Sequence, residues 1–430
     1  MTKVVAIGIG SVVFGVELLR DVYQTEELRG AELWLVDLDE AALRRMERLA
    51  TKLNEASGWD VRLHATTERA EALPNADFVV TSIAVDRERT WMRDHELALK
   101  HGFGSVLSEN GGPGGLSHTL RSVPAVVAVA KDIERLAPDT LLLNYTNPEN
   151  RVCLAVHKYT NVRSIGLCHG VAETVPFIAD ALGRERDEIE LRAAGTNHFT
   201  WTTSLRRHGD GSVLLPELRE KLKKLPPDVW PLCRMLFERF DVFPTTGDNH
   251  VGEYIGWAAE VCGTQGYDFS LYHRNGELSR QYVEAYGAGG RPVTSLLAKP
   301  SRESRLGHGS TQIIAALLNG STLPRPSFII PNDGYIENIE RDVVVEVPGM
   351  IEDGVWHGVA VGALAGPVQS MVQREIEIQK LAVEAAMTGS RELALQALLI
   401  DPVVHSAQAA EAFLDEMLLD HKRHLPAFWD

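Results

Sequence analysis

Short apolar runs alternate with amphipathic segments along the first third of the chain. Residues 3–9 form an apolar run that ends in a glycine-rich turn, and residues 16–22 then place apolar side chains at helical spacing. Further apolar runs follow at residues 32–36 and 77–84. Continuous apolar runs of this length are typical of parallel strands buried on both faces, and the segments between them suit crossover helices. The pattern predicts a βαβαβ unit at the N-terminus.

A unit of this kind predicts a doubly wound α/β domain of the Rossmann type. Beyond Trp201 the regular alternation ends. Apolar runs at residues 327–331 and 343–348 predict strands, whereas residues 366–425 have a helical pattern almost throughout. We therefore expect an N-terminal Rossmann-type domain and a second domain that is α+β and mostly helical. The predicted domains are residues 1–195 and residues 196–430.

Length and charge narrow the classes of protein that fit. A chain of 430 residues is long enough for two domains that share an interface. The formal net charge of −16 argues against nucleic acid or an anionic membrane as a partner. Four cysteines without a Cys-x-x-Cys pair argue against a structural zinc site. The sequence shows no signal peptide and no apolar run long enough to span a membrane. We expect a cytoplasmic homodimer or homotetramer.

The glycine-rich turn has the context that a dinucleotide pyrophosphate needs. Gly8-Ile9-Gly10-Ser11 lies between a predicted strand and a predicted helix, where backbone N–H groups face an anion. The third glycine of the usual Gly-x-Gly-x-x-Gly pattern is missing, since position 13 is Val13 and the next glycine is Gly15. The motif is therefore a variant of the dinucleotide-binding pattern.

An acidic residue at the end of the second predicted strand favours NAD over NADP. Asp37 can accept hydrogen bonds from a ribose diol and repel a 2′-phosphate. The alternative for Asp37 is a solvated loop carboxylate. The predicted NAD-binding residues are Gly8, Gly10, Ser11, Phe14, Asp37 and Ile83.

Two polar clusters follow later apolar runs, at residues 166–170 and 195–198. In an α/β protein the ends of strands deliver side chains into a ligand crevice. Cys168 and His198 are of the types that can share one divalent transition metal ion. The alternative is an inert buried cysteine and a core histidine. Asn147 also ends a predicted strand, where its amide suits a sugar hydroxyl or the cofactor ribose, or simply forms an Asn-Pro turn.

The ordered set of motifs resembles glycoside hydrolase family 4, the NAD- and manganese-dependent glycosidases. The resemblance extends along most of the chain, although Thr146-Asn147-Pro148 also resembles the lactate and malate dehydrogenases, which share the NAD domain. The matching segments are Gly8-Ile9-Gly10-Ser11 with Phe14, Thr146-Asn147-Pro148, Gly166-Leu167-Cys168-His169, Gly195-Thr196-Asn197-His198 and Asn332-Asp333-Gly334-Tyr335-Ile336.

The resemblance implies roles for individual residues. Cys168 and His198 would bind the metal ion, Mn²⁺ or another divalent transition metal. Asn147 and Asn197 would contact sugar hydroxyls, and His169 would be the general acid near the glycosidic oxygen. For the general base, the resemblance points to Asp248, with Tyr254 as the alternative.

The substrate class is also implied by resemblance. Cys168-His169-Gly170 is most similar to members that act on α-linked uronic acids. A uronate carboxylate needs a cationic partner, for which Arg302 and Arg305 are the candidates, with surface arginines as the alternative. A neutral α-galactoside or α-glucoside, or a sulfonated sugar, remains open. One departure from the family pattern is Ser310, because members commonly have a glutamate there.

The chemistry that the resemblance implies differs from direct displacement at the sugar. Transient oxidation of C3 by NAD makes the C2 proton acidic, so that a base can remove it and the leaving group departs by elimination. Water then adds and C3 is reduced again, so net redox is zero. The alternatives from other classes are a dehydrogenase acting on a hydroxy acid or sugar, and an NAD-binding sensor without catalysis.

Overall fold

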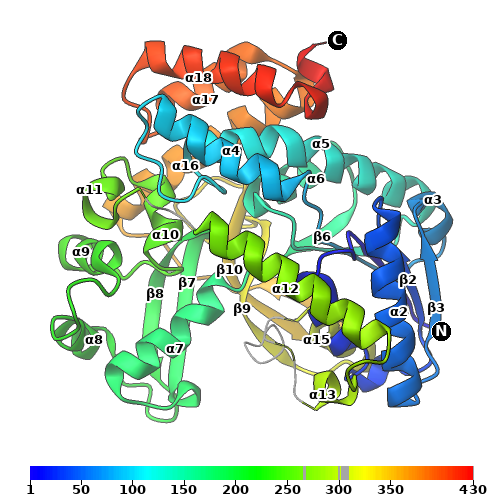
Figure 1. The fold of residues 1–430 in the computed structure, drawn as a ribbon. Coiled ribbons are helices and arrows are strands. Elements are labelled where there is room, and N and C mark those ends of the chain that lie inside the picture. Colours follow the sequence, from blue (N-terminus) through cyan, green and yellow to red (C-terminus); the bar gives the residue numbers. More distant parts are fainter. Residues whose placement is uncertain (265–267, 299–300, 302–308, 430) are drawn as a thin grey trace.

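The computed structural model describes residues 1–264, 268–298, 301 and 309–429 (Figure 1). Its N-terminal part is a parallel sheet with the strand order β3-β2-β1-β4-β5-β6, which is the order of dinucleotide-binding Rossmann domains. The predicted α/β class is therefore confirmed. The parallel strands are β1 (Lys3–Ile7), β2 (Glu32–Val36), β3 (Arg62–Thr66), β4 (Phe78–Thr81), β5 (Leu141–Asn144) and β6 (Arg163–Gly166).

Both faces of this parallel sheet are buried, as the continuous apolar runs predict. Along β1, Val4 and Ala6 belong to one apolar core, whereas Val5 and Ile7 belong to the core on the other face. Successive side chains of a strand point to opposite faces, so an unbroken apolar run serves both cores. The first six helices are α1 (Phe14–Val22), α2 (Glu40–Ser57), α3 (Arg69–Ala72), α4 (Arg87–Lys100), α5 (Gly112–Leu136) and α6 (Glu149–Tyr159).

An antiparallel extension continues the same sheet beyond β6. Strand β9 pairs with β6, β10 with β9, β7 with β10 and β8 with β7, while β11 pairs with β10. The domain boundary after residue 195 stays a prediction. Residue 195 itself lies within the strand β7. The extension consists of β7 (Ile189–Thr196), β8 (Phe199–Arg207), β9 (Leu323–Pro331), β10 (Val344–Glu352) and β11 (Val355–Gly358).

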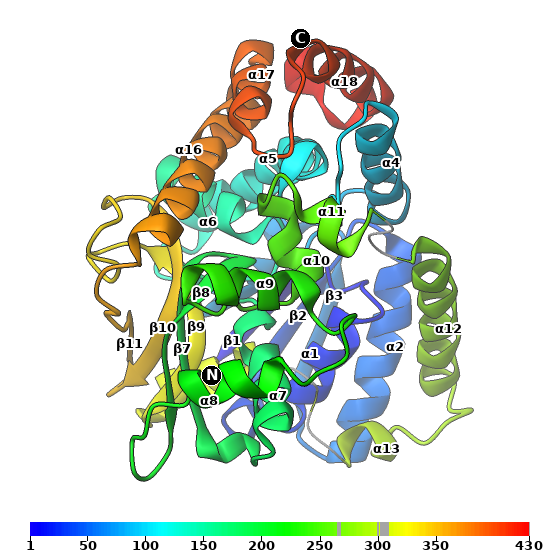
Figure 2. The same cartoon turned by 90° about the vertical axis from the view of Figure 1, so that its left-hand side faces the viewer.

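Helices of the C-terminal half pack against helices of the N-terminal half. Figures 1 and 2 show α16, α17 and α18 packed over α4, α5 and α6, while α12 lies along α2. Within the described residues, no helix combines the length and apolar character that a membrane span requires. The remaining helices are α7 (Gly170–Leu182), α8 (Leu215–Leu222), α9 (Pro231–Phe240), α10 (Asp248–Val251), α11 (Ala258–Cys262), α12 (Phe269–Gly287), α13 (Thr294–Leu297), α15 (Ser310–Asn319), α16 (Gly366–Thr388), α17 (Arg391–Ile400) and α18 (Ala407–Asp420).

A buried ionic cluster fixes the C-terminal segment against α4 and α5. Arg121 donates from both terminal nitrogens to the carboxylate of Asp94, at 3.2 and 2.5 Å. Ser117 Oγ donates to the same carboxylate at 2.7 Å, and His421 Nε2 lies 2.9 Å from it. Burial alone would raise the pKa of Asp94, but Arg121 and His421 outweigh it and lower the pKa. The carboxylate is thus charged and fully partnered.

Replacing this carboxylate should destabilise the protein strongly. Asp94→Asn leaves the Arg121 guanidinium buried without its counter-charge, which costs roughly 3–5 kcal/mol in comparable pairs. We expect that loss in the free energy of unfolding from urea titrations. The matched control is Asp415→Asn, which breaks the exposed ion pair with Arg391 and should change stability little. Equal effects of the two variants would contradict an anchoring role for the buried cluster.

Candidate functional site

The glycine-rich turn at the end of β1 has no room for side chains. Gly8 has φ +82°, and a Cβ there would lie 2.2 Å from the carbonyl oxygen of Ser82. A Cβ on Gly15 would lie 2.1 Å from the carbonyl oxygen of Ile9. Gly15 therefore provides the close contact between helix and strand that the third glycine of the usual pattern provides. The variant spacing still forms a dinucleotide-type turn.

The other predicted NAD-binding residues surround this turn. Asp37 Oδ2 accepts the Gly10 N–H at 2.8 Å, and Ser11 Oγ accepts the Phe14 N–H at 3.1 Å. The Ile83 N–H donates to Thr146 Oγ1 at 2.9 Å. The ends of β1, β2 and β4 thus meet at the N-terminus of α1, where the strand order reverses. This arrangement fits a dinucleotide, whose pyrophosphate is held by a helix N-terminus and whose ribose meets an acidic residue.

Asn147 connects this turn to a second group of polar side chains. Asn147 Oδ1 accepts a hydrogen bond from Asn110 Nδ2 at 3.1 Å. The same nitrogen of Asn110 lies 3.4 Å from Asn197 Oδ1 and 3.0 Å from His198 Nδ1. The structure thus brings together Asn147, Asn197 and His198, which the sequence predicts as site residues. They surround Asn110, which the sequence does not predict as a site residue.

Three of the described residues form a group that could hold a metal ion. One ligand atom from each of Glu109, His198 and His250 lies within 4.8 Å of the others. Burial lowers the pKa of His250. Burial and the neighbouring His250 together lower the pKa of His198 well below 6.5. Burial alone would raise the pKa of Glu109, but the Arg87 guanidinium outweighs it and lowers the pKa to about 2. Two neutral imidazoles and one carboxylate are donors that suit a divalent cation.

The geometry of His250 supports a role as a ligand. Its Nδ1 lies 2.7 Å from Asn249 Oδ1, a contact that places the proton on Nδ1 and leaves the Nε2 lone pair free. The rings of His198 and His250 meet edge to face, with centroids 4.3 Å apart. The sequence signal for these residues was weak, because Glu109 merely precedes a glycine-rich loop and His250 stands in a polar loop.

Cys168, the other predicted metal ligand, has different neighbours in this structure. Its Sγ accepts the Gly170 N–H at 3.5 Å and also bonds with Asn197. Burial raises the pKa of the Cys168 thiol well above 9, and the Glu346 carboxylate adds to the increase. A metal ion at Cys168 would have to displace this proton.

Glu346 is a buried site residue that sequence analysis missed. It lies in β10 opposite Gly195 of β7, and its Oε2 accepts a hydrogen bond from Asn197 Nδ2 at 3.0 Å. Burial raises the pKa of Glu346 to about 7, against the lowering effect of hydrogen bonds with Ser327 and Asn197. The available signal was a lone glutamate within an otherwise apolar strand.

The predicted acid and base residues differ in their surroundings. His169 directly precedes α7, is partly exposed and lies 3.6 Å from the Glu173 carboxylate. Both oxygens of Asp248 accept backbone N–H groups at the start of α9, from Leu232 at 3.0 Å and Cys233 at 2.9 Å. The Tyr254 hydroxyl is buried and donates to the carbonyl oxygen of Asn197 at 3.3 Å.

The predicted partners of a substrate carboxylate, Arg302 and Arg305, lie outside the described residues. Arg87 is a described guanidinium that contacts the site, because it donates to the Glu109 carboxylate and lies 4.2 Å from the centroid of the Trp91 ring. Ser310 is buried, and its N–H donates to the Tyr145 hydroxyl at 2.8 Å. Ser310, where family members commonly have a glutamate, therefore lies next to Tyr145, whose ring contacts Phe14 after the glycine-rich turn.

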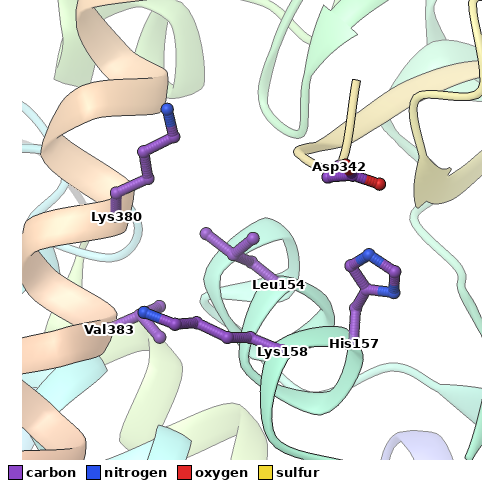
Figure 3. A pocket seen from close by; sticks show the side chains of 6 residues that line it. All are labelled: Leu154, His157, Lys158, Asp342, Lys380 and Val383. Carbon is purple, nitrogen blue, oxygen red and sulfur yellow. The ribbon is translucent and has the colours of Figure 1, made fainter. Parts of the chain in front are cut away.

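A separate cavity of about 370 Å³ lies at the opposite end of α6 from Asn147 (Figure 3). Figure 3 shows Lys158 and His157 from α6, Lys380 and Val383 from α16, and Asp342 from the turn before β10. Lys158 and Lys380 already pair with Glu384 and with Glu340. The cavity contains none of the predicted site residues.

Comparison with known proteins identifies one family along both halves of the chain. The family 4 glycosyl hydrolase model matches residues 3–184, and the model of that family's C-terminal domain matches residues 193–404. An α-glucosidase of Erwinia rhapontici is 32% identical and covers 97% of both chains. The α-galacturonidase of Bacillus subtilis (strain 168) is 29% identical over 97% of this chain and 96% of its own.

A solved structure shows the same fold. The crystal structure of a 6-phospho-α-glucosidase from gut microorganisms, in complex with NAD and Mn²⁺, superposes with a TM-score of 0.85. The match covers 98% of each chain at 19% sequence identity. The fold thus extends over both halves of the chain.

The buried carboxyl of Glu346 should make stability depend on pH. Its pKa is raised from 4.5 to about 7, so its contribution to stability is complete below pH 4.5 and is lost as the pH rises towards 7. The difference amounts to about 3 kcal/mol in the free energy of unfolding. Urea titrations at about pH 5 and pH 8 should show a smaller fall for Glu346→Gln than for the wild type. The exposed Glu377→Gln serves as control, and an equal fall in all three proteins would contradict the shift.

Proposed function

The chain belongs to the family 4 glycosyl hydrolases, and from that premise we propose that it hydrolyses an α-glycoside using NAD and a divalent metal ion, most suitably Mn²⁺. The supporting observation is a continuous path of contacts between the two candidate sites. Ile83 beside the glycine-rich turn bonds to Thr146, and the adjacent Asn147 reaches His198 through Asn110. A sugar between them would touch the nicotinamide side and the metal side at once.

The chain's own groups suit the individual steps. NAD, when bound, would supply a hydride acceptor for C3 of the sugar and later return the hydride, so that C3 is transiently a ketone and the C2 proton is acidic. Asn147 and Asn197 would hold the sugar hydroxyls, and the metal group of Glu109, His198 and His250 would lie beside them. A partly exposed His169 at the rim would protonate the leaving oxygen.

Two residues remain candidates for the base that removes the C2 proton. The Asp248 carboxylate is engaged at both oxygens by the N-terminus of α9. The Tyr254 hydroxyl lies next to Asn197 and therefore closer to the proposed sugar position. Burial raises the pKa of Tyr254 well above 10, so Tyr254 would need a neighbouring positive charge in order to act as a base. We place Tyr254 first on geometry and retain Asp248 as the alternative.

For the substrate, we propose an α-uronide. The support is the Cys168-His169-Gly170 segment, the α-galacturonidase among the relatives, and the Arg87 guanidinium beside Glu109. The α-glucosidase among the relatives keeps neutral α-glucosides and α-galactosides as alternatives, and a sulfonated sugar would suit the same cation. A homodimer or homotetramer in the cytoplasm remains our proposal for the assembly and its location.

The function can be tested with a panel of 4-nitrophenyl α-glycosides: the glucuronide, galacturonide, glucoside and galactoside. We expect hydrolysis only with NAD and Mn²⁺ together, fastest for a uronide, and without net formation of NADH. Hydrolysis in D₂O should leave deuterium at C2 of the released sugar, because the C2–H bond is broken and reformed. Mass spectrometry of the product and absorbance of NADH provide the measurements.

Several outcomes would decide between the alternatives. Protium fully retained at C2 would exclude elimination, and NADH formed in step with product would indicate a dehydrogenase instead. Faster cleavage of the neutral glycosides would reject the uronide assignment. Tyr254→Phe should suppress C2 exchange more than Asp248→Asn does, while neither variant should change NAD binding. The reverse order would assign the base to Asp248.

The metal ligands can be separated by measuring Mn²⁺ affinity in the presence of NAD. We expect His198→Ala to lose Mn²⁺ binding, because His198 belongs to both proposed ligand sets. Cys168→Ser, Glu109→Gln and His250→Ala should each weaken binding by roughly tenfold or more. Cys153→Ser is the matched control, a buried thiol outside the ligand sets. Unchanged affinity in Cys168→Ser would leave Glu109, His198 and His250 as the protein ligands.

A further inference from the structure

The side chain of Asn110 has an unsatisfied atom at the centre of the site. Asn110 belongs to the loop before α5, and the residue is 3% exposed. Its Nδ2 lies within reach of the amide oxygens of Asn147 and Asn197, and next to the ring nitrogen Nδ1 of His198. Its Oδ1 is buried and accepts no hydrogen bond among the described residues. A buried carbonyl oxygen without a donor costs free energy that folding alone does not recover.

Rotation of the amide by 180° gives the poorer set of contacts. The Asn110 oxygen would then face two acceptors, Asn147 Oδ1 and Asn197 Oδ1, with His198 Nδ1 as its one potential donor. The Asn147 oxygen is also fixed in this role, because it accepts the Glu149 N–H at 3.3 Å. The observed orientation, with the nitrogen towards the two amide oxygens, is therefore the better one.

The loop is also held in place, so its backbone cannot move to satisfy this oxygen. Glu253 Oε1 accepts the N–H groups of Glu109 at 2.5 Å and Asn110 at 3.0 Å. A Cβ on Gly111 would lie 2.7 Å from Glu253, which shows how closely the loop packs on this residue. The acceptor on Asn110 is thus presented in a fixed position between residues from three different segments.

We propose that Asn110 determines specificity by accepting, at Oδ1, a hydrogen bond from one hydroxyl of the sugar. The proposal rests on the proposed glycosidase function and adds a substrate contact to it. A hydroxyl donor would satisfy the unpartnered oxygen, while Asn147 and His198 hold the Asn110 amide from the other side. A sugar that lacks this hydroxyl leaves the oxygen buried and unpartnered, so the site selects against it.

Asn332 provides an internal comparison. It is also a buried asparagine, but its Oδ1 accepts the Ile336 N–H and its Nδ2 donates to three backbone carbonyl oxygens, those of Ile336, Ile339 and Glu340. Both ends of the Asn332 amide are therefore satisfied within the protein. Asn332 is structural by this criterion, whereas Asn110 has a free acceptor in the site.

The test measures a coupling between Asn110 and one hydroxyl group. The probe is the free sugar released from the glycoside that the wild type hydrolyses fastest in the panel, together with its monodeoxy derivatives. Inhibition constants are measured with NAD and Mn²⁺ present, for the wild type and for Asn110→Ala and Asn110→Asp. We expect one deoxy sugar to bind the wild type about tenfold more weakly than the parent sugar. Asn110→Ala should bind the two sugars equally, and Asn110→Asp, which keeps an acceptor oxygen, should retain a preference for the parent.

The controls separate this proposal from a merely structural role. If Asn110 only orients its neighbours, Asn110→Ala will weaken the parent and every deoxy sugar by the same factor, and the preference will persist, which overturns the proposal. Asn332→Ala should lower thermal stability and leave the preference intact. Should Asn110→Ala fail to fold, as judged by NAD binding, Asn110→Ser provides the same loss of the acceptor position. If the wild type hydrolyses no glycoside, the proposed function itself is wrong. If Asn110→Ala keeps the preference for the parent sugar, only this inference is wrong.

Discussion

Two glycines with no space for a side chain hold the polar clusters of the site on one sheet. A Cβ on Gly166 would lie 2.6 Å from the sulfur of Cys153, and a Cβ on Gly195 would lie 2.4 Å from the carbonyl oxygen of Phe199. At Gly166 the parallel strand β6 pairs with β9, and at Gly195 the strand β7 pairs with β10. Because each glycine is the first residue of a polar cluster, close backbone pairing there fixes the positions of Cys168 and His198.

The balance of buried charge explains why this region favours a cation. Glu109 is held as an anion by Arg87, whereas burial raises the pKa of Glu253 to about 8 and that of Glu346 to about 7. Burial thus favours the protonated forms of Glu253 and Glu346. A divalent cation between Glu109, His198 and His250 would supply positive charge where it is lacking. The same cation would favour ionised forms of its neighbours.

The sequence predicted the parts of the site that depend on local structure. The turn at Gly8, the acidic Asp37 and the clusters around Asn147 and His198 each follow an apolar run directly, so one strand is enough to place them. Asn110 and Glu346 were not predicted, because their partners in the site lie 88 and 149 residues away in the chain. No local pattern encodes such a pairing, which arises only when the antiparallel strands return to the parallel sheet.

The same distinction separates fold from chemistry. A glycine-rich turn with an acidic residue on the next strand serves many NAD-dependent dehydrogenases and does not by itself indicate glycoside cleavage. The match to the family 4 glycosyl hydrolase models points beyond a dehydrogenase. In the structure, the loop before α5 carries Glu109 and Asn110 and is bound to the segment of His250 and Tyr254 through Glu253. This contact brings residues from the two halves of the chain into one polar site. In the proposed function, the metal group and the sugar contacts therefore depend on a loop that one buried carboxyl group holds in place.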